Sequence, residues 1–199
     1  MTTDKKLIAA AAALLDSGGE DAVTLRAVGH AVGVSHNAPY KHFKDRDALL
    51  AAVAIVDFAM LTGALNSIRQ STSKPTTKLK RALKAVVEYG HAHPARYRLI
   101  FSNPGIAAQG GDIEKAALVA FAAFAAIVQE CQAKQELPDV SNTALSGLLY
   151  ASMHGLIDLE ASGRMRPARG LSSVGQSIDL LVQLLSSKVN ARAKIVQKS

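Results

Sequence analysis

The side chains best suited to chemistry gather in the short stretch VGVSHNAPYKHF, residues 32–43. This stretch carries His36, Asn37, Tyr40 and Lys41 in a chain that is otherwise strongly aliphatic. Short donors and acceptors of these types can meet base edges in the major groove, and the longer groups can reach phosphate oxygens. The residue types and their spacing therefore point to contacts with duplex DNA.

Two short helices with a turn between them must position these side chains. Thr24 is predicted to cap a first helix of sequence LRAVGHAV, whose apolar residues form one stripe. Gly33 is expected to end that helix, because a tight turn needs a backbone conformation that a β-carbon opposes. Ser35 is expected to cap a second helix over 36–43, in which Pro39 predicts an irregular first turn.

Residues 24–43 thus have the anatomy of a helix-turn-helix motif, whose second helix enters the major groove. On this interpretation His36 and Asn37 approach base edges. Two packed surface helices that bind nothing have the same spacing, so spacing alone leaves both interpretations open. The predicted DNA-contacting residues are Thr24, Arg26, Ser35, His36, Asn37, Tyr40, Lys41, His42 and Lys44.

The net charge of +7 is weak support for DNA binding because of where the charge lies. Residues 1–47 hold six Lys or Arg and six Asp or Glu, so they are neutral overall. Residues 164–199 hold seven basic residues and one acidic residue. The excess therefore indicates a solvated basic C-terminus rather than a DNA-binding surface.

Long Ala, Leu and Val stretches at helical spacing predict an all-α protein of about nine helices. A small group of three helices is expected over residues 1–48, and a larger C-terminal bundle over 49–199. The Ser/Thr-rich stretch 70–77 predicts a linker, and the sequence NPGIAAQGGD, residues 103–112, predicts a loop.

Several classes of site are not expected. The single cysteine, Cys131, excludes an internal disulfide and suits a reducing cytoplasm. The apolar window 116–129 is shorter than the roughly 20 residues that span a bilayer, so we interpret it as a buried helix and expect no transmembrane segment. His91 and His93 lack the i, i+4 spacing of a helical metal site. We therefore expect no metal, no cofactor and no catalytic residue.

The stretch TLRAVGHAVGVSHNAPYKHFKDRDALLAAV, residues 24–53, closely resembles the DNA-binding domain of TetR-family transcriptional regulators. The resemblance rests on Thr24 and Arg26, on Gly-Val-Ser at the turn, on Tyr-x-His-Phe and on a charged cap before Ala-Leu-Leu. Two residues depart from the family pattern, since Gly29 stands where alanine is usual and Arg46 where lysine is commoner. Glycine in place of alanine costs a helix up to about 1 kcal/mol.

Two further stretches, HPARYRLIFS (93–102) and MHGLIDLEASGRM (153–165), resemble the C-terminal ligand-binding domain of a TetR subgroup. Its second motif is usually written Trp-His-Gly, and Met153 stands here in place of the tryptophan. The resemblance implies an effector pocket with mostly apolar walls, although plain core packing is the alternative for each residue. The candidate pocket residues are Tyr89, His93, Tyr97, Phe101, Phe121, Phe124, Tyr150 and His154.

The resemblance implies a cytoplasmic, homodimeric regulator, most often a repressor, that a small-molecule effector releases from double-stranded operator DNA. In the family, two long helices such as 141–163 and 172–196 form the dimer interface with their symmetry mates. A two-fold dimer suits a palindromic operator. The alternative is an all-α small-molecule carrier or sequestering protein that does not read DNA, which the neutral charge of residues 1–47 supports. An enzyme is a third interpretation.

Overall fold

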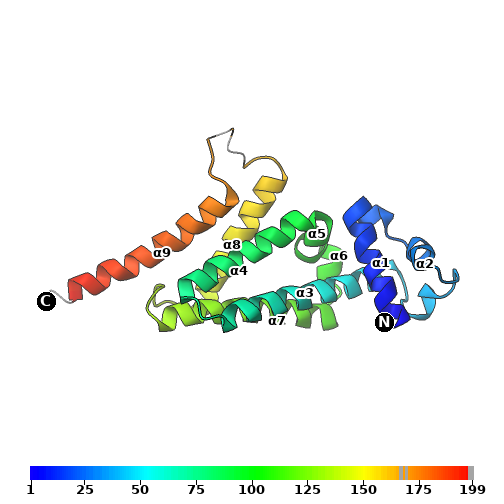
Figure 1. The fold of residues 1–199 in the computed structure, drawn as a ribbon, viewed down its shortest axis with the longest axis horizontal. Coiled ribbons are helices and arrows are strands. Elements are labelled where there is room, and N and C mark those ends of the chain that lie inside the picture. Colours follow the sequence, from blue (N-terminus) through cyan, green and yellow to red (C-terminus); the bar gives the residue numbers. More distant parts are fainter. Residues whose placement is uncertain (166–167, 169, 197–199) are drawn as a thin grey trace. The chain divides into compact units, whose positions relative to one another are not determined.

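The computed structural model describes residues 1–165, 168 and 170–196, with side chains to residue 186. The basic excess expected for 164–199 falls largely on side chains outside this description. The described chain is helical without strands, which confirms the predicted fold class (Figure 1). Its α-helices are α1 (Thr3–Gly18), α2 (Leu25–Val32), α3 (Arg46–Gln70), α4 (Pro75–Ala92), α5 (Pro94–Ser102), α6 (Pro104–Ala107), α7 (Gly111–Ala133), α8 (Asn142–Ala161) and α9 (Val174–Val196).

The chain divides into two compact units. The first consists of residues 1–62 and 89–120, and the second of residues 63–88 and 121 onward. Three helices, α3, α4 and α7, contribute residues to both units. In the first unit, α5 and α6 therefore belong with the three N-terminal helices. The functional division after residue 48 stays a prediction.

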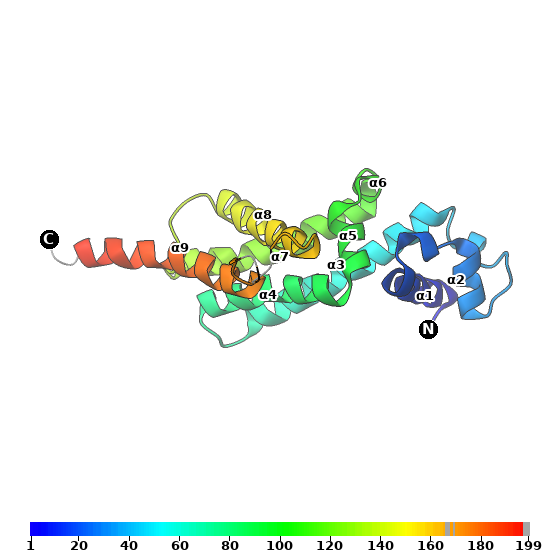
Figure 2. The ribbon, with the colours of Figure 1, turned by 90° about the horizontal axis from the view of Figure 1, so that it is seen from above.

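Apolar residues at helical spacing on α1 build the core of the first unit. Leu7, Ala11 and Leu15 are fully buried, because a spacing of four residues places them on one face of the helix. They share one buried cluster with Val28 of α2 and Phe58 of α3. Burying each such large side chain contributes about 2 kcal/mol, which holds the N-terminal helices together. Figure 2 shows α1 and α2 side by side.

The predicted helix ends around α2 are confirmed. Thr24 caps α2, since its Oγ1 accepts a hydrogen bond of 3.0 Å from the Ala27 amide. Gly33 ends the helix with φ at +73°, in the left-handed region that favours glycine. Asp45 caps α3 through a hydrogen bond of 2.8 Å from the Ala48 amide. Gly33 and Asp45 therefore determine where the segment between α2 and α3 begins and ends.

The loop predicted for 103–112 is wrong, because part of it forms the short helix α6. Asn103 Oδ1 accepts hydrogen bonds from the amides of Gly105 and Ile106, at 2.9 and 3.2 Å. Pro104 stands at the first helical position, where its missing N–H costs nothing. Ile106 is buried and fixes α6 to the core of the first unit.

The core of the second unit is formed by α7, α8 and α9 together with part of α4. Ile127, Leu149 and Ile178 are fully buried in it. Cys131 is also fully buried, and burial raises the pKa of its thiol to about 12. An uncharged, enclosed thiol is unreactive, which agrees with an inert packing role.

Ion pairs join helices at the surface of the second unit. Glu130 of α7 accepts hydrogen bonds from Arg69 Nε at 2.8 Å and from Lys78 Nζ at 3.2 Å. Partial burial opposes the charged form, but these two cations lower the pKa of the Glu130 carboxyl. Asp179 of α9 accepts a hydrogen bond of 2.8 Å from Lys84 of α4. Exposed pairs of this kind contribute up to about 1 kcal/mol each.

Two helices, α3 and α7, are long and apolar enough to cross a membrane by length and composition alone. Core helices of soluble proteins pass the same test, and half of the apolar window of α3 is buried. The interpretation of 116–129 as a buried helix is wrong in part. Leu118 and Val119 are 61% and 56% exposed, because only one side of α7 faces the core.

A buried ion pair lies inside the first unit. Asp57 of α3 is completely buried, and both of its carboxylate oxygens accept hydrogen bonds from the guanidinium of Arg96 on α5, one of them at 3.0 Å. A third bond, of 3.3 Å, runs from Arg96 to Asp16 on α1. Burial opposes the charged guanidinium, but the bonds from Arg96 to Asp57 raise its pKa. Burial, followed by the negative charge of Asp57, raises the pKa of Tyr89.

Replacing Arg96 with methionine is expected to lower the free energy of unfolding by about 3 kcal/mol, because Asp57 is left charged and buried. The double variant Asp57→Asn/Arg96→Met removes that charge and should recover part of the loss. Urea denaturation followed by circular dichroism measures both values. Equal stabilities for the single variant and the wild type would contradict this assignment.

Candidate functional site

The segment between α2 and α3, residues 33–44, is called the reading segment here. It is not the capped α-helix predicted for 36–43, because only Pro39–Lys41 form a short 3₁₀ helix. Pro39 lacks the N–H that an α-helix would need at this position. The expected cap is also wrong, since the Ala38 amide bonds to the backbone oxygen of Ser35, at 2.9 Å, rather than to its side chain. The irregular first turn predicted from Pro39 is confirmed.

The reading segment turns its polar side chains outward and three apolar residues inward, of which Val34 is partly buried. Pro39 is buried, and Phe43 is 8% exposed. Tyr40 is 52% exposed, and its ring lies 5.8 Å from that of His36. His36 Nδ1 lies 3.2 Å from Asn37 Oδ1. All nine predicted contact residues are exposed: Thr24, Arg26, Ser35, His36, Asn37, Tyr40, Lys41, His42 and Lys44.

Gly29 of α2 explains how the short segment packs so closely. A β-carbon at this position would lie 2.9 Å from Cγ of Pro39, so alanine could not stand there without a shift. Both residues are buried. Glycine at 29, a departure from the family pattern, is thus matched to the proline ring that packs against it. The sequence showed both residues but not their contact.

Arg46, the second departure from the family pattern, faces inward rather than toward a ligand. Its Nε donates a hydrogen bond of 2.8 Å to the backbone oxygen of Val23, and its Nη2 donates to that of Glu20. Nη2 also lies 3.8 Å from the Glu20 carboxylate. Arg46 therefore holds the residues that lead into α2, and its forked guanidinium reaches two backbone oxygens through two different nitrogens.

Four of the eight predicted effector residues lie in the first unit, where they form two ring pairs. The rings of Tyr89 and His93 are 5.5 Å apart, and those of Tyr97 and Phe101 are 5.0 Å apart. Tyr89 and Tyr97 are buried. His93 caps the start of α5, and its Nδ1 lies 2.9 Å from Asp16 Oδ2. This set therefore combines core packing with a polar contact to α1.

The other four effector candidates lie in the second unit. Phe121 and Tyr150 meet edge to face at 5.6 Å, and Tyr150 meets His154 at 4.2 Å. Phe124 is buried nearby in sequence, on α7. Burial lowers the pKa of His154 to about 4 and raises that of Tyr150. Both side chains are therefore neutral near pH 7, as suits an apolar ligand.

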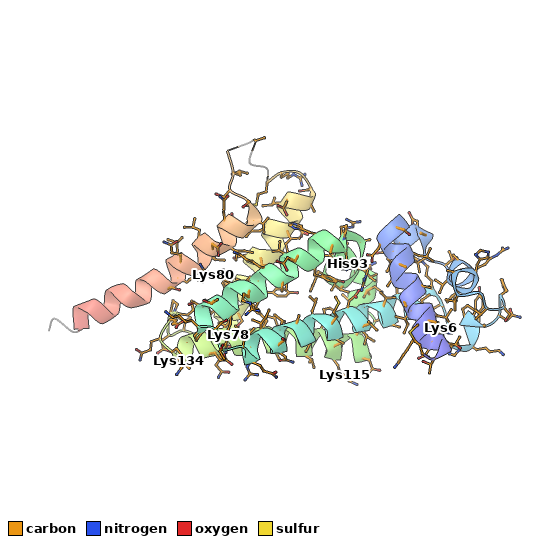
Figure 3. All side chains as sticks on the ribbon, in the orientation of Figure 1. Lys6, Lys78, Lys80, His93, Lys115 and Lys134 are labelled. Atoms are coloured by element: carbon orange, nitrogen blue, oxygen red, sulfur yellow. The ribbon has the colours of Figure 1, made fainter. Side chains whose placement is uncertain are left out.

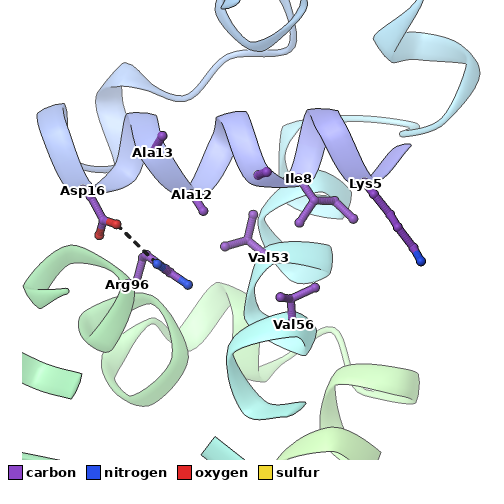
Figure 4. A pocket seen from close by; sticks show the side chains of 9 residues that line it. Lys5, Ile8, Ala12, Ala13, Asp16, Val53, Val56 and Arg96 are labelled. Atoms are coloured by element: carbon purple, nitrogen blue, oxygen red, sulfur yellow. Dashed lines mark hydrogen bonds and ion pairs between the residues drawn. The ribbon is translucent and has the colours of Figure 1, made fainter. Parts of the chain in front are cut away.

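Two cavities in the described chain are lined by residues that sequence reasoning missed. The larger, of about 620 Å³, lies in the first unit between α1, α3 and α5 (Figure 4). Its walls include Ile8, Val53 and Val56, and one end carries the Asp16–Arg96 pair. A second, of about 390 Å³, lies in the second unit beside Lys78 and Glu130, among others. In the sequence, only the alanines of α1, which lie opposite α3 in the structure, indicate space for the first cavity.

Metal ligation finds no support among the residues that the structure describes. Within them, no group of three or more His, Cys, Asp or Glu side chains is placed to hold an ion. His93, one of the two histidines for which no metal role was expected, contacts Asp16 and Arg96. These three polar side chains of the first unit therefore contact one another.

Two family models match the chain. One, described as bacterial regulatory proteins of the tetR family, matches residues 7–53, which include α2 and the reading segment. The other, described as the Tetracyclin repressor-like C-terminal domain, matches residues 79–185, more than half of the chain.

Solved structures with the same fold cover nearly the whole chain. A protein of unknown function from Rhodococcus sp. RHA1 is 25% identical with a TM-score of 0.78, over 94% of this chain and 95% of that one. The fatty acid degradation regulator FadR from Bacillus halodurans is 12% identical with a TM-score of 0.72, over 94% and 95%. The TetR-family regulator PfmR from Thermus thermophilus is 16% identical with a TM-score of 0.63, over 92% and 97%.

A comparison with curated proteins finds no match. Together, the two family models nevertheless begin in α1 and end in α9, and a tetR-family regulatory match is followed along the chain by a Tetracyclin repressor-like C-terminal match. The chain therefore belongs to the TetR family and is a ligand-responsive, DNA-binding transcriptional regulator.

Proposed function

We propose that the protein is a cytoplasmic repressor that binds a palindromic operator as a homodimer and leaves it when a small molecule binds. The observation that carries the proposal is the outward display of His36, Asn37 and Tyr40 on a segment anchored by the buried Pro39 and Phe43. His36 and Asn37 are assigned to base edges, and Tyr40 to phosphate. Binding to DNA requires no catalysis, and we assign no catalytic residue.

The predicted phosphate and base contacts differ in how they respond to substitution. Lys44→Ala should weaken binding to every duplex and lower the slope of log K against log[salt] by about 0.9, since one phosphate contact is lost. Asn37→Ala should instead weaken binding mainly to the preferred sequence, by about 1–3 kcal/mol. Fluorescence anisotropy measures both, with a duplex that the wild type selects from a random-sequence pool and with a scrambled duplex.

The matched control for that measurement is Lys134→Ala, which removes an exposed lysine from the second unit (Figure 3). It should leave affinity and salt slope unchanged. If Lys44→Ala behaves like Lys134→Ala, residue 44 does not contact phosphate. If the wild type retains all duplexes equally, the assignment of base-reading residues is wrong.

For the effector we propose an uncharged, largely apolar small molecule that binds against Phe121, Tyr150 and His154. These three rings are partly buried and mutually in contact, so they offer stacking surface in the second unit. His154 is neutral at pH 7 because burial lowers its pKa to about 4. A charged ligand would find no opposite charge in this set. The two ring pairs of the first unit, Tyr89 with His93 and Tyr97 with Phe101, are assigned to core packing.

His154 should make stability depend on pH in a defined window. Its pKa is about 6.5 in the unfolded chain and about 4 in the fold, so the unfolded state binds more protons between these values. The free energy of unfolding should therefore fall as the pH drops from 6.5 to 4. His154→Gln removes this contribution, which amounts to about 3 kcal/mol. Urea denaturation of both proteins at pH 7 and pH 4.5 gives the difference, and a difference independent of pH would contradict the assignment.

The dimer interface is assigned to α8 and α9, which pack on each other and expose a set of leucines. Apolar side chains exposed on neighbouring helices are typical of a surface that another chain covers. The four leucines, between 45% and 57% exposed, are Leu148, Leu159, Leu180 and Leu184.

The double variant Leu180→Asp/Leu184→Asp should convert the dimer into a monomer, since two charges cannot be buried unpaired in an apolar interface. Sedimentation velocity measures the mass of the particle. Leu118→Asp is the matched control, because Leu118 is 61% exposed on α7, outside this surface. A dimer that survives the double substitution, or that Leu118→Asp disrupts, would place the interface elsewhere.

A further inference from the structure

One side chain in the first unit bonds in two directions at once. Asn103 Oδ1 accepts hydrogen bonds from the first amides of α6, at 2.9 and 3.2 Å. Asn103 Nδ2 donates to both carboxylate oxygens of Glu20, at 2.9 and 3.1 Å. The amide group thus caps α6 with its oxygen and reaches the N-terminal helices with its nitrogen.

Glu20 belongs to the short stretch of residues 19–24 that joins α1 to α2. On its other side this stretch is held by Arg46, which donates to the backbone oxygens of Glu20 and Val23. It ends at Thr24, the cap of α2. Besides the buried Val23, two polar side chains therefore hold the start of α2, one from α3 and one from the cap of α6.

The chemistry at position 103 requires an amide. Serine, threonine or aspartate could cap α6 equally well, but none of them offers an N–H₂ group to a carboxylate while its oxygen caps the helix. The bonds to Glu20 are charge-assisted, so they are stronger than ordinary amide bonds. Ile106 anchors α6 in the buried cluster of the first unit, which makes Asn103 a firm point of attachment.

We propose that Asn103 is a positioning residue for operator binding, which links the order of α6 to the order of residues 19–24 and so to the N-terminus of α2. Each end of the amide affects the other element. If α6 loses its cap, the donor to Glu20 is no longer held in place, and if the bonds to Glu20 are lost, Arg46 alone holds that residue and the start of α2 loosens. The proposal deepens the proposed function and rests on it, because operator binding is the activity that Asn103 serves.

The test is Asn103→Asp, which keeps the capping oxygen and places a second carboxylate against Glu20. Amide hydrogen exchange, without DNA, should quicken about tenfold at Ala27 and Val28, whose amides bond to the side chain and backbone oxygens of Thr24. Affinity for the selected duplex should fall about tenfold. Exchange around Leu7, Ala11 and Leu15 of α1 and in α8 should stay unchanged, which shows that both units remain folded.

The swapped pair Glu20→Gln/Asn103→Asp supplies the decisive control. Here the donor stands at 20 and the acceptor at 103, so both the exchange rates and the affinity should return close to wild-type values. A merely structural loss at 103 would not be restored by a change at 20. If Asn103→Asp proves globally unfolded, Asn103→Ser keeps a capping hydroxyl without the donor and should show the same local effect at Ala27 and Val28.

The link is overturned if exchange at these two amides does not respond to Asn103→Asp or Asn103→Ser, or if the swapped pair fails to restore it. A wild type that retains no duplex of any sequence would instead overturn the proposed function. The exchange rates would still decide, in that case, whether Asn103 orders the start of α2. The two failures are therefore distinguishable.

Discussion

The contact between Gly29 and the ring of Pro39 determines how the reading segment is presented. The segment is too short to bury much surface of its own, so its orientation depends on the few side chains that it turns inward. Pro39 can be buried there at little cost because it has no N–H to satisfy, and Gly29 leaves the space that its ring occupies. The up to about 1 kcal/mol that glycine costs α2 is offset by this packing. With Pro39 and Phe43 facing inward, Tyr40 and its neighbours must face solvent.

Polar contacts take over where elements are too short for apolar packing. Asn103 and Arg46 hold the residues before α2, and Arg96 joins α1, α3 and α5 through Asp16 and Asp57. Hydrogen bonds depend on direction, so they specify an orientation that non-directional apolar burial leaves loose. The buried charge of Asp57 has a further consequence: α5 can leave α3 only by exposing or neutralising that carboxylate, which makes separation costly.

Signals confined to a few neighbouring residues were the ones that sequence reasoning could use. The cap at Thr24, the left-handed turn at Gly33 and the cap at Asp45 follow from local chemistry, and so do the all-α fold and the outward face of the reading segment. The α-helix expected over 36–43 failed because Pro39 lacks the N–H that an α-helix needs there, so that only a 3₁₀ turn forms. The loop expected at 103–112 failed because Asn103 caps a short helix within it. Contacts between residues far apart along the chain, such as Asp57 and Arg96, cannot be predicted from the residue spacing within either helix. Cavities are marked only weakly, as by the alanines of α1, since they are defined by atoms that are missing between helices. The candidate effector residues were predicted from their residue types alone. In the structure, four of them lie in the first unit and four in the second.

The zero net charge of residues 1–47 supports the alternative, a protein that does not bind DNA. The positions of the charged side chains in the structure argue against this alternative. Of the acidic groups, Asp16 and Glu20 are engaged with Arg96 and with Asn103, and Asp45 bonds to the start of α3. The cations Arg26, Lys41 and Lys44 are exposed, on or beside the reading segment. These three carboxylates thus bond to protein groups, while the three cations are exposed to the solvent. Asp21, Asp45 and Asp47 are exposed as well, so this part of the chain carries both signs at its surface. An anionic duplex responds to the charges that lie nearest to it rather than to the sum, because charges farther away than a Debye length of about 8 Å are largely screened.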